Sequence, residues 1–462
     1  MDGARAFAFL ATTAAATALA TPLLYNSTTV EYGYVPEPKG RGTVGILWSC
    51  LTTFLLSVWT AMHPNITPNA TLSDRVLHKF FWAIITVLFP ELILLRSCSQ
   101  WMEAIELRRM WCEKFHVNPG EEGDLIGIEG AYFVLMGGFI APRSHETAQY
   151  TTTLTSEGFK WGIQNDLLPQ DVFRKQDIVD KGKANNIAKL IVCIQAGWML
   201  VQVLGRLAAR LPVTLLEVHV SIQVLIAVVL YTLWWSKPLD VDQPIELPPL
   251  APYASDIETA KFYIAKAENE PQNTDKMPLG SYVTEKHRTG AAYMFCRVIF
   301  DLATAMLALP GQKQLSIGLP AILISIYGAL HITAWNAHFP TLVECWLWRM
   351  TCVGMLCAGG ILVLPFRVLG QTGNEVVLAL WRLRLRAGSG NFGNAIWSVF
   401  LELRHEVAKD TPQFLKFDFS MCSLLVYLMA MIFLTVESIV SLRQLPVDAY
   451  KTPTWTGLWP HI

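Results

Sequence analysis

The chain carries little charge and no excess of either sign. Of its 462 residues, 16% are charged, and the formal net charge at pH 7 is −1. Soluble domains average about 25% charged residues, so this deficit argues against an ordinary water-soluble domain. The balanced charge also provides no basic surface for nucleic acid, and we expect no nucleic-acid partner.

Several motifs that would identify a chemistry are missing as well. The nine cysteines form no CxxC pair and lie mostly in apolar runs, where a thiol behaves as a small hydrophobic group. The sequence contains no P-loop, no dinucleotide-binding glycine fingerprint, no nucleophile elbow and no HExxH zinc motif. We therefore predict no metal site and no cofactor, and the absence of these motifs leaves open whether the protein is an enzyme.

Long apolar runs are abundant. Hydrophobic residues make up 52% of the chain, and the mean hydropathy is +0.35. A helix needs about 20 apolar residues to cross a hydrocarbon core about 30 Å thick. Runs of that length predict spans at about residues 43–62, 76–97, 188–206, 214–235, 292–310, 317–337, 346–366 and 420–440. The predicted fold is all-α, a polytopic transmembrane bundle of seven or eight spans surrounded by membrane lipid. The count is seven if the run at 292–310, which contains Arg297 and Asp301, is not a full span.

The spans divide the chain into segments. Residues 1–25 resemble a signal peptide or an uncleaved signal anchor, because Arg5 precedes an alanine-rich apolar stretch. The expected membrane segments are a transmembrane pair at 43–97, a hairpin at 188–235, a core with a polar turn at 291–366, and a last helix with a short tail at 419–462. The expected insertions are a polar subdomain at 98–187, a proline-rich tether and helix at 236–290, and an amphipathic loop at 367–418.

Orientation in an endomembrane or plasma membrane is predicted from basic residues and sequons. Basic residues after the second span favour a cytoplasmic location for 98–187 and a lumenal location for 63–75. Asn26, Asn65 and Asn69 each begin a sequence that N-glycosylation requires. The span at 43–62 separates Asn26 from the other two, so all three cannot carry glycan together. A cleaved signal peptide requires the opposite orientation, and both remain open.

The polar turn between the spans at 317–337 and 346–366 is the predicted site. His331 and Glu344 are the candidate catalytic residues, because an imidazole and a carboxylate at a membrane edge can do general acid–base work. His331, Trp335 and His338 are spaced i, i+4, i+7, which places them on one helix face if the helix reaches residue 338. The alternative is a polar turn whose groups satisfy each other.

Further candidates are predicted to bind a ligand. Arg349 can hold an anionic group, and Asn336 and His338 lie in the same turn. Glu91 follows Pro90 within the second span, where it can accept a proton or meet Arg297.

Glu217 and His219 open the span at 214–235. Their i, i+2 spacing makes them face different ways, which favours structural pairing with another helix over a joint chemical role.

Five segments occur in a recognisable order. They are RGTVGILWSCLTTFLLSVWTAMHPN, WAIITVLFPELIL, LWWSKPLDVDQPI, HITAWNAHFPTLVECWLWRM and the terminal SLRQLPVDAY with WPHI. Together they resemble a functionally uncharacterised family of multi-pass membrane proteins from filamentous fungi, over nearly the whole chain. The resemblance implies that architecture and a fungal origin. Because such families often accompany specialised metabolism, it also implies a lipophilic small molecule as the partner.

Three functions follow from these observations. The leading one is a multi-pass membrane protein that handles a lipophilic small molecule. The second is an intramembrane transferase or cyclase, since FPTLVECWLWR resembles the FPxLxxFWxRRW-like segment of wax-synthase-type membrane-bound O-acyltransferases. In that family a histidine in an apolar helix follows the segment, whereas His331 precedes it here. The third is a transporter- or receptor-like binding protein.

Overall fold

The computed structural model describes most of the chain. The described residues are 30–37, 41–67, 70–121, 124–140, 150–164, 168, 170, 185–239, 241, 243–246, 282–286, 293–295, 297–299, 301, 313–371 and 411–452. Most of them are helical, which agrees with the predicted helical bundle in its coarse form.

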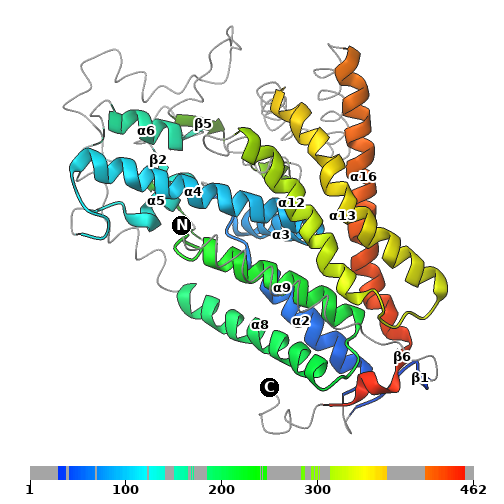
Figure 1. Ribbon diagram of the computed structural model, residues 1–462. Coiled ribbons are helices and arrows are strands. Elements are labelled where there is room, and N and C mark those ends of the chain that lie inside the picture. Colours follow the sequence, from blue (N-terminus) through cyan, green and yellow to red (C-terminus); the bar gives the residue numbers. More distant parts are fainter. Residues whose placement is uncertain are drawn as a thin grey trace.

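Six long helices run side by side in the bundle (Figure 1). They are α2 (Thr43–Ala61), α8 (Asn185–Ala208), α9 (Leu215–Leu233), α12 (Lys313–His331), α13 (Leu342–Gln371) and α16 (Thr411–Val440). Helix α9 lies at the centre and contacts α2, α8, α12 and α16. Residues 367–371 and 411–418, predicted to belong to an amphipathic loop, are helical and extend α13 and α16.

The predicted span at 76–97 is two helices that meet at a sharp bend. Helix α3 (Leu72–Leu88) and helix α4 (Pro90–Phe115) are inclined by 113°. Pro90 lacks a backbone N–H and its ring clashes with the preceding turn, so it opens a new helix instead of continuing the old one. Helix α4 then passes the predicted boundary at residue 97 without a break and ends at Phe115.

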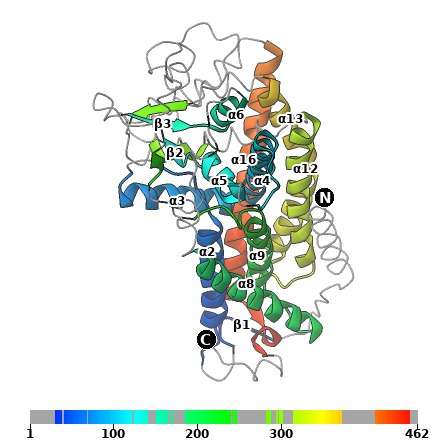
Figure 2. The same cartoon turned by 90° about the vertical axis from the view of Figure 1, so that its left-hand side faces the viewer.

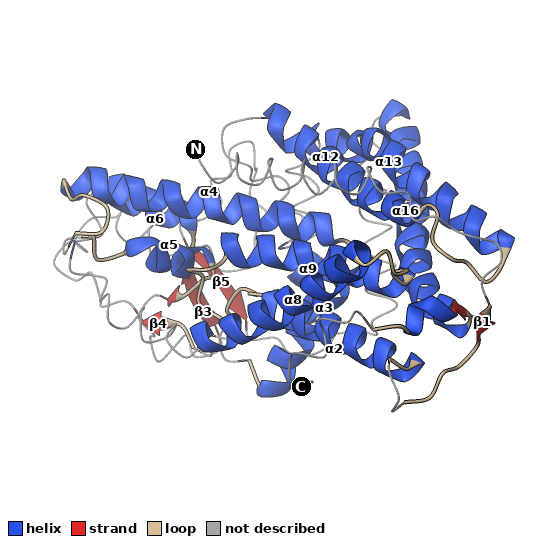
Figure 3. Cartoon of the chain, turned by 60° about the horizontal axis from the view of Figure 1, so that its bottom comes forward, coloured by secondary structure: helices blue, strands red, loops and turns tan. Residues whose placement is uncertain are grey.

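A small α+β unit lies at one end of the bundle (Figures 2 and 3). It contains α5 (Gly127–Leu135), α6 (Ser156–Gln164) and a four-stranded sheet in the order β4-β2-β3-β5. The strands are β2 (Phe139–Ile140), β3 (Tyr150–Leu154), β4 (Ile245–Glu246) and β5 (Tyr282–Lys286). The sequence TLTSEGFKWGI is typical of a capped helix start with Thr155 or Ser156 as the cap. The structure has Thr155 there, and its hydroxyl accepts a hydrogen bond from the Gly158 N–H at 3.0 Å.

The sheet corrects the all-α expectation. Its strands β4 and β5 lie in the segment 236–290, for which a proline-rich tether and a helix were expected. Strand β4 falls within that segment and pairs in parallel with β2, so that Ile245 faces Phe139 in the ladder. The sequence does not predict the two-residue strand β4, because the adjacent Pro244 and nearby Pro248 break any longer β pattern. The pairing fastens the segment after α9 to the subdomain that follows α4.

The opposite end of the bundle joins the two ends of the described chain. Strand β1 (Glu31–Tyr32) pairs antiparallel with β6 (Leu445–Pro446), which lies between the short 3-10 helices η6 (Ser441–Arg443) and η7 (Val447–Tyr450). The buried Arg206 guanidinium of α8 donates to the carbonyls of Pro212, Asp448, Ala449 and Lys451. These bonds hold the chain after α16 against the start of α9.

Four helical segments of the described chain are long and apolar enough to cross a membrane, and the bent α3–α4 pair makes five if it counts as one span. The four are Thr43–Ala61, Leu190–Ala208, Leu215–Leu233 and Leu425–Arg443. They match the predicted spans at 43–62, 188–206, 214–235 and 420–440. Helix α12 occupies residues 317–331 of the predicted span 317–337, and α13 occupies all of 346–366. Within the first of these, Ile322–Ala334 is a shorter apolar segment. Most of 292–310 lies outside the described residues.

Candidate functional site

Six polar side chains meet inside the apolar bundle. None is more than 4% exposed, and they come from four helices. They are Glu91 on α4, His219 and Gln223 on α9, Tyr327 and His331 on α12, and Tyr427 on α16. We call these six residues the core polar cluster. Buried polar groups persist in a core only where hydrogen bonds compensate for lost water.

Helical spacing explains how two pairs of these residues face each other. His219 and Gln223 are four residues apart on α9, and Tyr327 and His331 are four apart on α12, so each pair lies on one helix face. The α9 face and the α12 face then pair in register. His219 meets His331, and Gln223 meets Tyr327.

The two histidines form a hydrogen-bonded chain whose tautomers follow from its end. His331 Nδ1 lies 3.0 Å from the Tyr327 carbonyl oxygen, which can only accept, so His331 Nδ1 carries the hydrogen. In the neutral ring His331 Nε2 is then an acceptor, and His219 Nδ1 donates to it across 3.1 Å. This leaves His219 Nε2 as an acceptor, and it has no partner among the described residues.

Glu91 and two tyrosines form the other half of the cluster. The Tyr427 hydroxyl donates to Glu91 Oε2 at 2.7 Å, and its ring stacks on Phe89 at 5.6 Å. Gln223 Nε2 donates to the Tyr327 hydroxyl oxygen at 3.0 Å. Glu91 Oε1 has no partner among the described residues, although it is buried. The sequence offered two roles for Glu91, accepting a proton or meeting Arg297. Glu91 accepts a hydrogen bond from Tyr427, and Arg297 donates to the Ile66 carbonyl.

Aromatic rings enclose the histidine pair. The Phe54 ring lies 6.1 Å from the His219 ring, and the Trp348 ring lies 5.9 Å from the His331 ring. An arrangement of neutral donors and acceptors in such surroundings can hold a polar group of an otherwise apolar molecule. Its imidazoles and carboxyl group are also the types that transfer protons in general acid–base catalysis.

The residues of the predicted polar turn do not converge on one site. Helix α12 ends at His331 and continues as the 3-10 helix η4 (Ile332–Ala334) before a turn, so the predicted i, i+4, i+7 face does not extend to His338. His331 points into the core polar cluster, whereas Glu344 forms an ion pair with Arg443. The two candidate catalytic residues thus have separate partners.

The remaining turn residues have other surroundings. Arg349 donates to the Trp335 carbonyl and stacks over the rings of Trp335 and Trp346, at 5.1 and 5.4 Å. His338 Nε2 lies 3.6 Å from Glu31 Oε1. Burial lowers the pKa of His338, against the opposing attraction of Glu31. Asn336 is exposed.

The sequence analysis singled out three members of the cluster, His331, Glu91 and His219, and did not identify Gln223, Tyr327 or Tyr427. His219 was expected to pair with another helix, and it does so through His331. Its neighbour Glu217 also has a structural role. Glu217 closes a capping box with Thr214 and forms an ion pair with Arg41. Polar residues four apart in an apolar helix, such as His219 and Gln223, are a pattern in the sequence that could have identified further members of the cluster.

The predicted glycosylation residues lie away from this cluster. Asn65 is half-buried in the connection between α2 and α3, while Asn26 and Asn69 lie outside the described residues. No group of three or more His, Cys, Asp or Glu side chains in the described part of the chain is placed to hold a metal ion.

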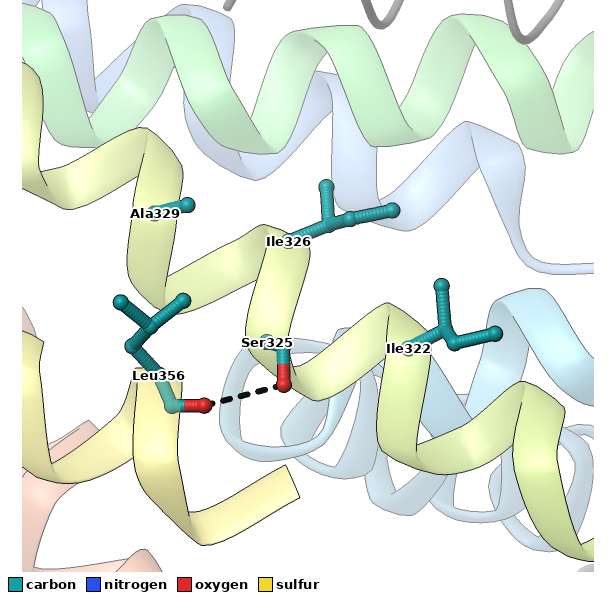
Figure 4. Close-up of a pocket in the computed structure, with 5 residues that line it drawn as sticks. All are labelled: Ile322, Ser325, Ile326, Ala329 and Leu356. Carbon is teal, nitrogen blue, oxygen red and sulfur yellow. Dashed lines mark hydrogen bonds between the residues drawn. The ribbon is translucent and has the colours of Figure 1, made fainter. Parts of the chain in front are cut away.

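An apolar groove of about 320 Å³ runs along the outer side of α12 beside α13 (Figure 4). Ile322, Ser325, Ile326, Ala329 and Leu356 line it. The Ser325 hydroxyl donates to the Leu356 carbonyl at 3.0 Å, so the polar atom in the groove is already satisfied. Nearby Gly328 permits close helix packing, because a Cβ there would lie 2.8 Å from the Leu356 nitrogen.

Comparison with known proteins identifies a family. A family model described as "Family of unknown function (DUF8562)" matches residues 14–252 and 316–462, so the chain belongs to that family. No curated protein and no solved structure matches the chain.

Proposed function

We propose that the chain is a multi-pass integral membrane protein that binds a lipophilic small molecule at the core polar cluster. The observation that carries this proposal is a buried polar cluster inside a bundle whose outer helix faces are apolar. The core polar cluster brings six hydrogen-bonding side chains together inside this bundle, and two of them present buried acceptor atoms that have no partner among the described residues. Such acceptors are costly in a protein that binds nothing there.

The outer faces of the spanning helices support the membrane part of the proposal. Large apolar side chains are exposed along α2, α8 and α16, including Trp48 at 66%, Leu204 at 63% and Val426 at 69%. Apolar surfaces of this extent are unusual on soluble monomers and suit contact with lipid. We include α12 and α13 among the spans, for a total of seven or eight.

The biological setting that we propose is specialised metabolism in a filamentous fungus, in an endomembrane or the plasma membrane. It rests on the sequence resemblance and on the lipophilic ligand that the bundle would hold. The cytoplasmic location of 98–187 is part of the same proposal.

Identification of co-purified molecules tests ligand binding. The full chain is purified in mild detergent, and extracted small molecules are identified by mass spectrometry. We expect an apolar molecule enriched over the host lipids in the wild type and depleted in Gln223→Leu, which replaces a cluster residue with an apolar one of similar size. Tyr231→Phe is the matched control, because Tyr231 is a buried residue of the same helix whose hydroxyl bonds to Thr60. Equal small-molecule content in all three proteins would contradict the proposal.

A second candidate function is an intramembrane transferase or cyclase. The His219–His331 chain and the Glu91 carboxyl favour it, since together they supply proton donors and acceptors in one buried place. His331→Ala should then abolish product formation, whereas Glu344→Ala should only weaken the contact with Arg443. A binding or transport protein would instead release its ligand unchanged.

A further inference from the structure

The hydrogen-bonding capacity of Tyr327 and Glu91 is only partly used. The Tyr327 hydroxyl accepts from Gln223, and its own hydrogen is matched to no acceptor among the described residues. Glu91 accepts from Tyr427 through Oε2, while Oε1 has no partner there. Tyr327 therefore has an unused donor and Glu91 an unused acceptor, in addition to the acceptor His219 Nε2 of the same cluster.

The two groups are neighbours. Tyr327 is 1% exposed and Glu91 is 3% exposed, and each takes part in a buried hydrogen bond of the core polar cluster. The helices that carry them, α12 and α4, pack against one another. No direct hydrogen bond joins Tyr327 to Glu91. A third polar group placed between them can therefore bond to both.

We propose that this third group is the hydroxyl of a lipophilic alcohol, which donates to Glu91 Oε1 and accepts from the Tyr327 hydroxyl. The inference rests on the proposed function and names the class of ligand. A hydroxyl both donates and accepts, whereas an ether, a ketone or an ester only accepts and a hydrocarbon does neither. An ionised carboxylic acid only accepts, so it has no hydrogen to donate to Glu91 Oε1.

The arrangement makes the site selective for an alcohol over its methyl ether. The ether keeps the shape and the acceptor but leaves Glu91 Oε1 without a donor, in surroundings where water is excluded. Sites built to hydrogen-bond a hydroxyl discriminate against analogues that lack it, because their buried polar groups are then unpaired. We expect the affinity for the alcohol to exceed that for its methyl ether about tenfold or more. A tenfold difference in affinity corresponds to about 1.4 kcal/mol.

The test uses the full chain in lipid nanodiscs with defined probes. Tritiated hexadecanol, farnesol and cholesterol are bound to the protein and displaced by each unlabelled alcohol or by its methyl ether. We expect at least one alcohol to displace its tritiated form at about a tenth of the ether concentration or less. Tyr327→Phe and Glu91→Met should each reduce that ratio to near one, while Tyr231→Phe should leave it unchanged.

The possible outcomes are distinct. Equal displacement by alcohol and ether in the wild type would overturn this inference and leave ligand binding in place. A preference that persists in both Tyr327→Phe and Glu91→Met would also overturn it, because the hydroxyl would then lie elsewhere. No specific binding of any probe would overturn it together with the proposed function. The wild-type ratio decides the matter even if a variant does not fold.

Discussion

Replacing Glu217 separates two contributions to the start of α9. Its carboxylate accepts from the Thr214 N–H at 2.9 Å and from the Thr214 hydroxyl at 3.0 Å, while the Glu217 N–H donates back to Thr214 at 3.2 Å. The same carboxylate pairs with Arg41, and the two side chains are 4% and 17% exposed. Glu217→Gln keeps a side chain that can complete the capping box but removes the negative charge.

The magnitudes follow from this geometry. Exposed ion pairs contribute about 0–1 kcal/mol, and breaking a fully buried pair costs about 3–5 kcal/mol. Because Arg41 is partly exposed, we expect Glu217→Gln to lower the free energy of unfolding by about 1–3 kcal/mol. Glu217→Ala also removes the cap and should cost about 0.5–2 kcal/mol more.

The assay is unfolding by SDS titration in mixed micelles, with a double-mutant cycle between Glu217→Gln and Arg41→Met. The cycle should give a favourable coupling energy between residues 41 and 217. Binding of the small molecule should be unchanged in folded Glu217→Gln. If Glu217→Gln is as stable as the wild type, or Glu217→Ala is no worse than Glu217→Gln, the reasoning is refuted.

Three further predictions concern packing, pH and the C-terminal segment. Gly328→Ala should destabilise the α12–α13 hairpin in the same titration, because its Cβ would lie 2.8 Å from the Leu356 nitrogen, whereas Gly354→Ala meets nothing within 4 Å and should not. Although burial opposes the charge, hydrogen bonds from Arg108 and the Gly120 and Gly127 N–H groups hold the pKa of Asp124 below its ordinary value of 3.8. A carboxyl group whose pKa is lowered in the folded protein stabilises the fold above its ordinary pKa of 3.8. The difference in free energy of unfolding between the wild type and Asp124→Asn should therefore be full above pH 3.8 and shrink as the pH falls below 3.8, and a constant difference would contradict this. Arg206→Met should speed tryptic cleavage after Arg443, since the four carbonyls held by Arg206 lose their donor; an unchanged cleavage rate would be evidence against the clamp.

The positions of the main helices could be predicted because apolar runs of spanning length are a strong signal. The predicted runs at 43–62 and 214–235 are helices within a few residues of their expected ends. The bend between α3 and α4 was not predicted, although Pro90 lies within the expected span at 76–97. A proline is tolerated both inside a kinked span and at the start of a new helix, and only packing decides between them.

The site was predicted only in part because its contacts are between helices. His331 was singled out, but spacing along the chain assigned it to a turn with His338 and Glu344. Its partner His219 follows from the way α12 packs on α9, whereas Tyr327 lies one turn earlier on α12 itself. Tyr427 lies 336 residues from Glu91, a pairing that no local pattern contains.

Solubility of the full chain tests the central claim, that apolar helix faces of this bundle contact lipid. Membranes from cells expressing the protein are extracted with alkaline carbonate and then with mild detergent. We predict that the chain stays with the membranes in carbonate and is released only by detergent, as the exposed apolar faces of α2, α8 and α16 require. A chain released by carbonate that remains monodisperse in buffer without detergent would contradict the account.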